Sequence, residues 1–268
     1  MFGDSEDIYV QLLGPFSARV GDAVVTPSAT KQRQVLAMLA LNPRQLVTTS
    51  TLVGELWEGR PPPSFGATLH TYIFQVRRAL GTAQHGKRDV KHVLSTRHSG
   101  YLLECRTDIE EARRLAMAGR TAAEEGDPRS ASDFLVRALA LWRGPALADV
   151  RQGPVLEAEA AALAETRLSL LGRRIEADLA MHRNADVIGE LATLVAAHPT
   201  NENFCGLLMR ALYHSGYTAR ALEAFRRLRA SLSRELGVEP GSALQRLHRA
   251  ILSGDLAAAA NDPPGRTA

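Results

Sequence analysis

The segment that decides the fold of this chain reads PPPSFGATLHTYIFQVRRALG (residues 61–81), and VLSTRHSGYLLE (residues 93–104) follows it closely. A proline-rich turn leads into an amphipathic helix that ends in Arg77-Arg78, and a short β-hairpin then carries Arg97 and His98 at its tip. Residues 60–103 contain seven lysines and arginines against one acid. A helix and a hairpin that share a positive face suit a DNA groove and the phosphates beside it. The pattern therefore predicts a winged helix that binds duplex DNA.

The flanking sequence supplies the other elements of such a domain. Residues 8–26 alternate apolar and polar around a Gly21-Asp22 turn, which predicts a β-hairpin. A helix is expected after Pro27, with Ser28 or Thr30 as its cap, and it stops at Asn42-Pro43. Two further helices are predicted over residues 50–57 and 67–80, with strands returning over residues 93–103.

The predicted helix 67–80 has two different faces. Leu69, Ile73, Val76 and Leu80 recur at steps of four, three and four residues, so they form one stripe that should pack on the other two helices. The opposite face carries Thr71, Phe74, Gln75 and Arg78, with His70 and Arg77 on its flanks. In a major groove, Gln can pair with adenine, Arg with guanine, and Thr or an aromatic ring with a thymine methyl. Two alternatives stay open: a basic helix can be simply a solvated face, and Phe74 belongs to the core if the phase is wrong by one position.

Other basic groups are expected to hold phosphates without reading sequence. Arg77 and Lys31 are candidates, and the start of the first helix offers backbone N–H groups to an anion. The predicted DNA-binding set is Thr30, Lys31, Gln32, Arg33, His70, Thr71, Phe74, Gln75, Arg77, Arg78, Arg97 and His98.

The composition of the 268-residue chain separates two parts. Residues 1–105 carry 11 basic and 8 acidic residues, while residues 106–268 carry 21 of each. A neutral, Ala- and Leu-rich part is expected to contact protein rather than nucleic acid.

Only two cysteines occur, Cys105 and Cys205, which favours a reducing compartment and two buried thiols. The N-terminus has no export signal, and no apolar run approaches the ~20 residues that cross a bilayer. We therefore expect a cytoplasmic, nucleoid-associated protein.

From Thr107 onward the pattern is helical and loosely repeated. Gly126 and Gly216 are each followed by small or apolar residues at +5, +9 and +12, and Asn184 is followed by Gly189, Thr193 and Ala196. Only the Gly216 unit is a good match, and the other two are degenerate. Small residues at +5 let two antiparallel helices approach closely, as in tetratricopeptide-type hairpins. Residues 256–268 are expected to form a disordered tail.

The sequence contains no motif for catalysis or for a bound cofactor. The eight histidines and two cysteines show no metal-ligand spacing, and neither GxSxG nor a glycine-rich phosphate loop is present. The prediction is a protein that is not an enzyme, with no catalytic residues, no metal and no cofactor.

The sequence of this chain resembles the Streptomyces antibiotic regulatory protein family of transcription activators. The N-terminal match comprises LLGPFSARVGDAVV (12–25), KQRQVLAMLALNP (31–43), LVGELWEGRPPPSFGATLHTYIFQVRRALG (52–81) and STRHSGYLLE (95–104). The C-terminal match comprises residues 157–183 and 190–252. The resemblance implies an α+β OmpR-type winged helix-turn-helix over residues 1–105 and an all-α, tetratricopeptide-like bacterial transcriptional activator domain over residues 106–255. Phe74-Gln75 stands where relatives often carry a polar residue and Arg, so their base preference is not transferred.

The resemblance also implies a mechanism. Family members bind direct repeats near the −35 region of a promoter, usually as a head-to-tail pair. They recruit RNA polymerase through its σ factor and α subunit, and so activate antibiotic or other secondary-metabolite gene clusters. The expected partners are therefore double-stranded promoter DNA, RNA polymerase and a second copy of the chain. The alternative is a helical-repeat module in which a small ligand or peptide gates DNA binding.

Overall fold

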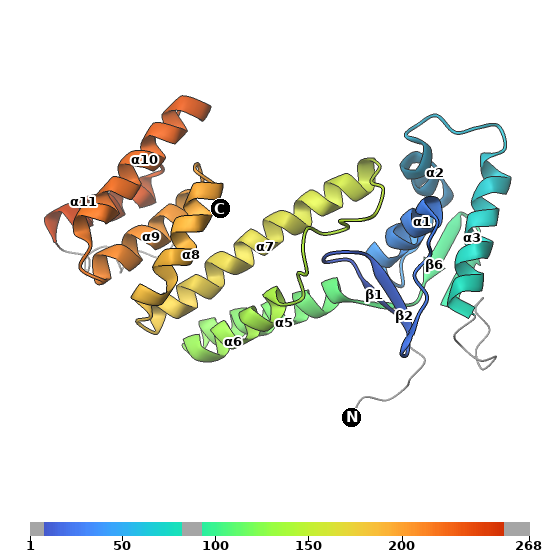
Figure 1. Cartoon of the computed structure of the whole chain (residues 1–268), viewed down its shortest axis with the longest axis horizontal. Helices are drawn as coiled ribbons and strands as arrows, with labels where there is room; N and C mark the ends of the chain where they lie inside the picture. Colours follow the sequence, from blue (N-terminus) through green and yellow to red (C-terminus); the bar gives the residue numbers. More distant parts are fainter. Residues whose placement is uncertain (1–7, 82–92, 255–268) are drawn as a thin grey trace. The chain divides into compact units, whose positions relative to one another are not determined.

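The computed structural model of the protein describes residues 8–81 and 93–254 (Figure 1). Residues 82–92, which fall within the basic segment 60–103, and the predicted tail 256–268 lie outside the described residues. The predicted fold class, a small strand-rich winged domain followed by a helical domain, is confirmed.

The chain begins with a four-stranded sheet. Its strands are β1 (Ile8–Gln11), β2 (Ser17–Val20), β3 (Ala23–Val24) and β7 (Arg106–Thr107), in the order β3-β2-β1-β7. The predicted Gly21-Asp22 turn joins β2 to β3, and Gly21 has a positive φ of 55°. Strand β7 pairs parallel to β1. Residues 106–107 had not been predicted as a strand, since two residues are too short for an alternating pattern.

Three helices follow, as predicted: α1 (Thr30–Leu41), α2 (Thr49–Trp57) and α3 (Phe65–Gly81). The predicted cap of α1 is wrong. Ala29 occupies the N-cap position with extended backbone angles, so the side chains of Ser28 and Thr30 lie on either side of it and no side-chain cap forms. Helix α2 is capped by Thr48, whose Oγ1 accepts a hydrogen bond from the Thr51 N–H at 3.1 Å.

A second sheet has the order β4-β6-β5. Strands β5 (Leu94–Arg97) and β6 (Gly100–Leu103) form the predicted hairpin, and β4 (Leu46–Thr48) pairs antiparallel to β6. Gly100 allows the hairpin to approach β4 closely, because a Cβ at this position would overlap the Val47 carbonyl oxygen. Strand β4 was missed, since three residues beside a helix cap give little periodic signal.

The remaining chain is helical. Its helices are α5 (Asp108–Glu124), α6 (Pro128–Leu139), α7 (Pro154–Ala180), α8 (Asn184–Ala197), α9 (Glu202–His214), α10 (Thr218–Leu236) and α11 (Ser242–Ser253). Helix α8 packs on α9 and α9 on α10, as expected for helical hairpins.

Two of the three predicted repeat units have the expected register. The residues at +5, +9 and +12 from Gly126 and from Gly216 are all buried. The unit assigned to Asn184 is wrong, because Gly189 and Thr193 are exposed. The turn residue with positive φ is His182 (59°), and counting from it places the buried Val187 and Leu191 at +5 and +9. The register error arises because His182 occupies a left-handed position that usually favours glycine.

Residue contacts divide the chain into two units. Within the described residues, unit 1 holds 8–81, 93–118 and 136–170, and unit 2 holds 119–135 and 171–254. The three helices of the winged domain therefore share a unit with the N-terminal part of α7.

A buried carboxylate links α2 to the start of α7 within unit 1. Glu55 is 1% exposed, and its carboxylate accepts hydrogen bonds from the backbone N–H groups of Gly153 (2.7 Å) and Val155 (2.8 Å). The first N–H groups of a helix have no partner within the helix, and a carboxylate beside them is also favoured by the helix dipole. Gln34 of α1 donates to the same carboxylate at 3.2 Å. Glu55 is thus the N-terminal cap of α7, supplied from α2.

Two further acids accept backbone N–H groups of the N-terminal sheet region. Asp108, 1% exposed, accepts from Leu12 (2.8 Å) and Leu13 (3.0 Å). Burial raises the pKa of Asp108, and these backbone hydrogen bonds and Arg143 partly oppose that shift. Asp149 accepts from the Phe16 N–H at 2.6 Å. Residues beyond 105 therefore satisfy polar groups of the winged domain.

The capping role of Glu55 yields the first prediction. We expect Glu55→Gln to lower the free energy of unfolding by about 2 kcal/mol, because an amide NH₂ group would replace one acceptor oxygen and face a backbone N–H. Urea denaturation followed by circular dichroism measures this change. The control is Glu58→Gln, since Glu58 is exposed and pairs with Arg151 at 3.5 Å, and its loss should cost less than about 0.5 kcal/mol. Equal effects of the two substitutions would contradict the capping role.

Candidate nucleic-acid interface

Helix α3 has one buried and one exposed face, in the predicted phase. The buried residues are Leu69, Ile73, Val76 and Leu80, as expected from their spacing. His70, Thr71, Phe74 and Arg78 are exposed. Their steps of one, three and four residues place these side chains on one face of the helix.

Phe74 settles the question of phase. Its side chain is 65% exposed, so the alternative that placed it in the core is wrong. A large aromatic side chain in solvent gains nothing from burial within the chain. Its ring is available to a partner that covers this face of α3.

The β5–β6 hairpin is fastened to α3 by side-chain hydrogen bonds. The guanidinium of Arg77 donates to the Leu94 carbonyl from Nε (2.9 Å) and Nη2 (2.7 Å), and from Nη2 to the Thr96 hydroxyl (2.8 Å). The Tyr101 hydroxyl lies 3.3 Å from His70 Nδ1. Arg77 had been predicted to hold a phosphate, but its guanidinium bonds the hairpin and so fixes the hairpin beside the helix.

Arg97 and His98 are exposed at the turn between β5 and β6, as the sequence placed them. The turn lies beside α2, since the Ser99 carbonyl accepts the Thr49 N–H at 2.9 Å. The tip is thus anchored by backbone contacts while its two basic side chains point to solvent.

The first turn of α1 is engaged mostly within the protein. Lys31 Nζ donates to the Leu56 carbonyl, and burial lowers the pKa of Lys31. The Arg33 guanidinium forms an ion pair with Asp149 at 2.6 Å. Gln32 Nε2 donates to Gln75 Oε1 at 2.7 Å, which ties α1 to α3. Thr30, at the first helical position, is exposed.

The predicted DNA-binding residues thus fall into two groups, those with exposed side chains and those whose side chains bond to other parts of the chain. The structure brings to one region the exposed face of α3 and, through Arg77, the hairpin. The side chains of Lys31, Arg33 and Arg77 are held by other parts of the chain.

Sequence reasoning missed the residues that hold this surface in place, above all Glu55, Thr96 and Tyr101. A signal existed for Glu55, because it falls between Leu52 and Leu56 on the apolar side of a short helix. An acid at such a position is rarely buried without partners.

Within residues 8–81 and 93–254, no group of three or more His, Cys, Asp or Glu could hold a metal ion. Cys105 and Cys205 are buried as predicted, and burial raises the pKa of each thiol to about 12. None of the helices in the described ranges is long and apolar enough to span a bilayer.

Comparison with known proteins gives matches to both parts of the chain. The model of the bacterial transcriptional activator domain matches residues 107–252, and that of the "transcriptional regulatory protein, C terminal" family matches residues 25–103. The chain is 44% identical over 261 residues to the regulatory protein DnrI of Streptomyces peucetius, covering 95% of both proteins. It is 35% identical over 250 residues to the transcriptional regulator RedD of Streptomyces coelicolor, covering 92% of this chain and 71% of RedD.

A solved structure is also similar. The Mycobacterium tuberculosis protein EmbR, in complex with a low-affinity phosphopeptide, matches with a TM-score of 0.89 and 34% identity. The match covers 93% of this chain and 66% of the EmbR chain. An OmpR-type winged domain joined to a bacterial transcriptional activator domain, in a chain related to DnrI and RedD almost throughout, places this protein in the Streptomyces antibiotic regulatory protein family of transcriptional activators.

Proposed function

We propose that the protein binds double-stranded promoter DNA with α3 in the major groove and the β5–β6 hairpin against the neighbouring phosphates. The observation that carries the proposal is the exposed face of α3, where Phe74 and Arg78 lie open beside a hairpin that Arg77 holds in place. The match of residues 25–103 to the transcriptional regulatory family also supports this proposal.

The contacts suggest a role for each side chain. Arg78 would pair with guanine, and Thr71 and Phe74 would touch a thymine methyl. Gln75 would donate to a base while its Oε1 accepts from Gln32. Arg97, His98 and the N–H groups at Thr30 would meet phosphates. His70, whose ring meets the Tyr101 hydroxyl, would border the groove.

Lys31, Arg33 and Arg77 would act by a different route. Their side chains are already bonded to the Leu56 carbonyl, Asp149 and the Leu94 carbonyl. We assign these three residues to positioning the DNA-binding elements rather than to direct contacts.

The transcriptional role follows from the family. We propose that a head-to-tail pair of chains binds direct repeats near the −35 region and recruits RNA polymerase through its σ factor and α subunit. The target would be a secondary-metabolite gene cluster in the cytoplasm. In this division of labour residues 1–105 bind DNA, and residues 106–255 supply contacts to the second copy and to polymerase.

A ligand-gated role has one specific observation in its favour. A hollow of about 1110 Å³ in unit 2 is lined by residues of α5, α6 and α7, among them Ala123, Leu135 and Ala177. A gating ligand there would change the affinity for DNA, whereas the activator proposal requires no ligand. Titrating DNA with and without cell metabolite extract separates the two.

The contacts of Arg78 and Arg97 predict different losses. Arg78→Ala should weaken binding to the specific site by about 1–3 kcal/mol and binding to random DNA much less, because Arg78 reads a base edge. Arg97→Ala should weaken binding to the specific site and to random DNA nearly equally, because Arg97 holds a phosphate. It should also reduce the slope of log K against log salt concentration by about one. Fluorescence anisotropy across a salt series measures both.

Arg19→Ala is the control for loss of charge. Arg19 is exposed on β2, where its guanidinium lies over the Tyr9 ring, and its removal should leave specific binding nearly unchanged. If Arg97 rather than Arg78 proved selective for the specific site, the assignment of α3 as the reading helix would be wrong.

Phe74 separates DNA binding from stability. Phe74→Ala should change the free energy of unfolding by less than about 0.5 kcal/mol, since the ring is exposed. It should nevertheless weaken specific DNA binding by about 1 kcal/mol through the lost methyl contact. The adjacent control Ile73→Ala, in the core at 1% exposure, should cost about 3 kcal/mol of stability. Unaltered DNA affinity of a stable Phe74→Ala protein would remove Phe74 from the interface.

The promoter role is tested by a footprint of the full chain, with and without RNA polymerase, on promoter fragments from its gene neighbourhood. We expect protection of spaced direct repeats beside the −35 element, tightened by polymerase. Protection that polymerase does not alter would leave DNA binding standing and exclude recruitment. Absence of protection at low salt would exclude the DNA proposal itself.

A further inference from the structure

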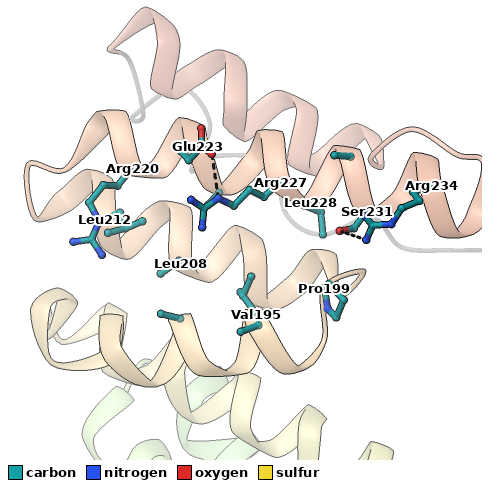
Figure 2. A pocket seen from close by; sticks show the side chains of 14 residues that line it. Val195, Pro199, Leu208, Leu212, Arg220, Glu223, Arg227, Leu228, Ser231 and Arg234 are labelled. Atoms are coloured by element: carbon teal, nitrogen blue, oxygen red, sulfur yellow. Dashed lines mark hydrogen bonds and ion pairs between the residues drawn. The ribbon is translucent and has the colours of Figure 1, made fainter.

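A groove in unit 2 combines an apolar floor with a row of arginines on one rim (Figure 2). Its volume is about 540 Å³, and α8, α9 and α10 all contribute to its lining. It lies far along the sequence from the residues of the proposed DNA interface, and none of the lining residues belongs to that set.

The floor of the groove is apolar because of the sequence of these three helices. Leu208 and Leu212 come from α9, Leu228 from α10 and Val195 from α8. The hollow exists because small side chains, Ala192 and Ala196 on α8 with Ala224 and Ser231 on α10, stand where larger ones would fill it. An elongated apolar trough between helices is the shape that receives the apolar face of a partner helix.

Arg220, Arg227 and Arg234 form the basic rim. They follow one another at intervals of seven residues on α10, so successive side chains lie on one face about 10.5 Å apart. Figure 2 shows all three along the same helix above the floor. Among the described residues that line the groove, Glu223 is the one acidic side chain.

The contacts that now engage these arginines are weak and exposed. Arg227 donates to Glu223 at 3.0 Å, and its side chain is 78% exposed. Arg234 pairs with the adjacent Glu235 at 2.8 Å, donates a long hydrogen bond to the Ser231 hydroxyl at 3.4 Å, and is 67% exposed. The Arg220 guanidinium lies 5.3 Å from the centroid of the Tyr217 ring. Exposed pairs of this kind contribute little stability, so a partner's carboxylates can replace them at low cost.

We propose that this groove binds an acidic amphipathic helix of a protein partner. The apolar side of the partner helix would lie on Leu208, Leu212 and Leu228, and carboxylates two turns apart would meet the arginine row. The charges favour this occupant over a basic helix, and the apolar floor favours it over DNA, whose phosphates would gain nothing from leucine side chains. The inference does not depend on the DNA-binding proposal, since its test contains no DNA.

The test uses the full chain and labelled synthetic peptides. The probe is a helical peptide of about 18 residues, long enough to span the three arginines at ~1.5 Å per residue, with a leucine stripe and glutamates at the two-turn spacing. A second peptide carries lysines in place of the glutamates, and a third has serines in place of the leucines. Fluorescence anisotropy at moderate salt should detect the glutamate peptide, with at least about tenfold weaker binding of the other two.

Paired variants locate the binding. The double variant Arg220→Ser, Arg227→Ser should bind the glutamate peptide about tenfold more weakly, as expected for the loss of two exposed charge pairs. The matched control, Arg229→Ser with Arg249→Ser, removes the same charge at exposed positions outside the groove lining and should leave the affinity unchanged. Replacing the three rim arginines by glutamate should reverse the preference toward the lysine peptide, a gain that misfolding cannot produce.

Several results would overturn the inference. No binding of the glutamate peptide at millimolar concentration would do so, as would equal losses in the rim and control variants. The rim variants are also assayed for DNA affinity and for oligomeric state. If either changes while peptide binding does not, the arginine row serves DNA or a second copy of the chain instead.

Discussion

The arrangement of unit 1 depends on one carboxylate, that of Glu55. It is buried in α2, yet its oxygens accept the N–H groups of Gly153 and Val155 at the start of α7, about one hundred residues later in the chain. A buried charge with fewer partners would be costly, so α2 and α7 stabilise one another through this contact. The same approach explains Gly153, since a Cβ there would overlap the Glu55 carbonyl oxygen. Contacts that stabilise the winged helix therefore come from residues beyond its last strand.

The candidate DNA-binding surface is built on this frame with a clear separation of tasks. Side chains that face inward from α1 and α3, such as Lys31 and Arg77, bond to neighbouring backbone and fix the spacing of the elements. The side chains that face outward, such as Phe74 and Arg78, are open. A fixed spacing between helix and hairpin reduces the entropy lost when both meet a rigid duplex.

Much of this could be predicted from the sequence, for identifiable reasons. The phase of α3 was predictable because four apolar residues repeat over a long helix, and the Gly21-Asp22 hairpin because turn chemistry is local. The contacts of Lys31, Arg33 and Arg77 were not predictable, because a lysine or arginine that bonds a carbonyl or a carboxylate within the chain looks the same in sequence as one that bonds a phosphate. The repeat register at His182 was missed for a related reason, since its left-handed backbone occurs without the glycine that usually marks such a turn.

The openness of the outer face of α3 has an evolutionary consequence. Positions 71, 74 and 78 contribute little to the hydrophobic core, so their side chains can be exchanged without loss of the fold. The fastening of the hairpin relies instead on Arg77, which donates to the Leu94 carbonyl and to the Thr96 hydroxyl. In the proposed DNA-binding role of α3, duplicated copies of such a regulator would therefore acquire new promoters by changes at a few surface codons, while the residues behind that surface are inherited unchanged.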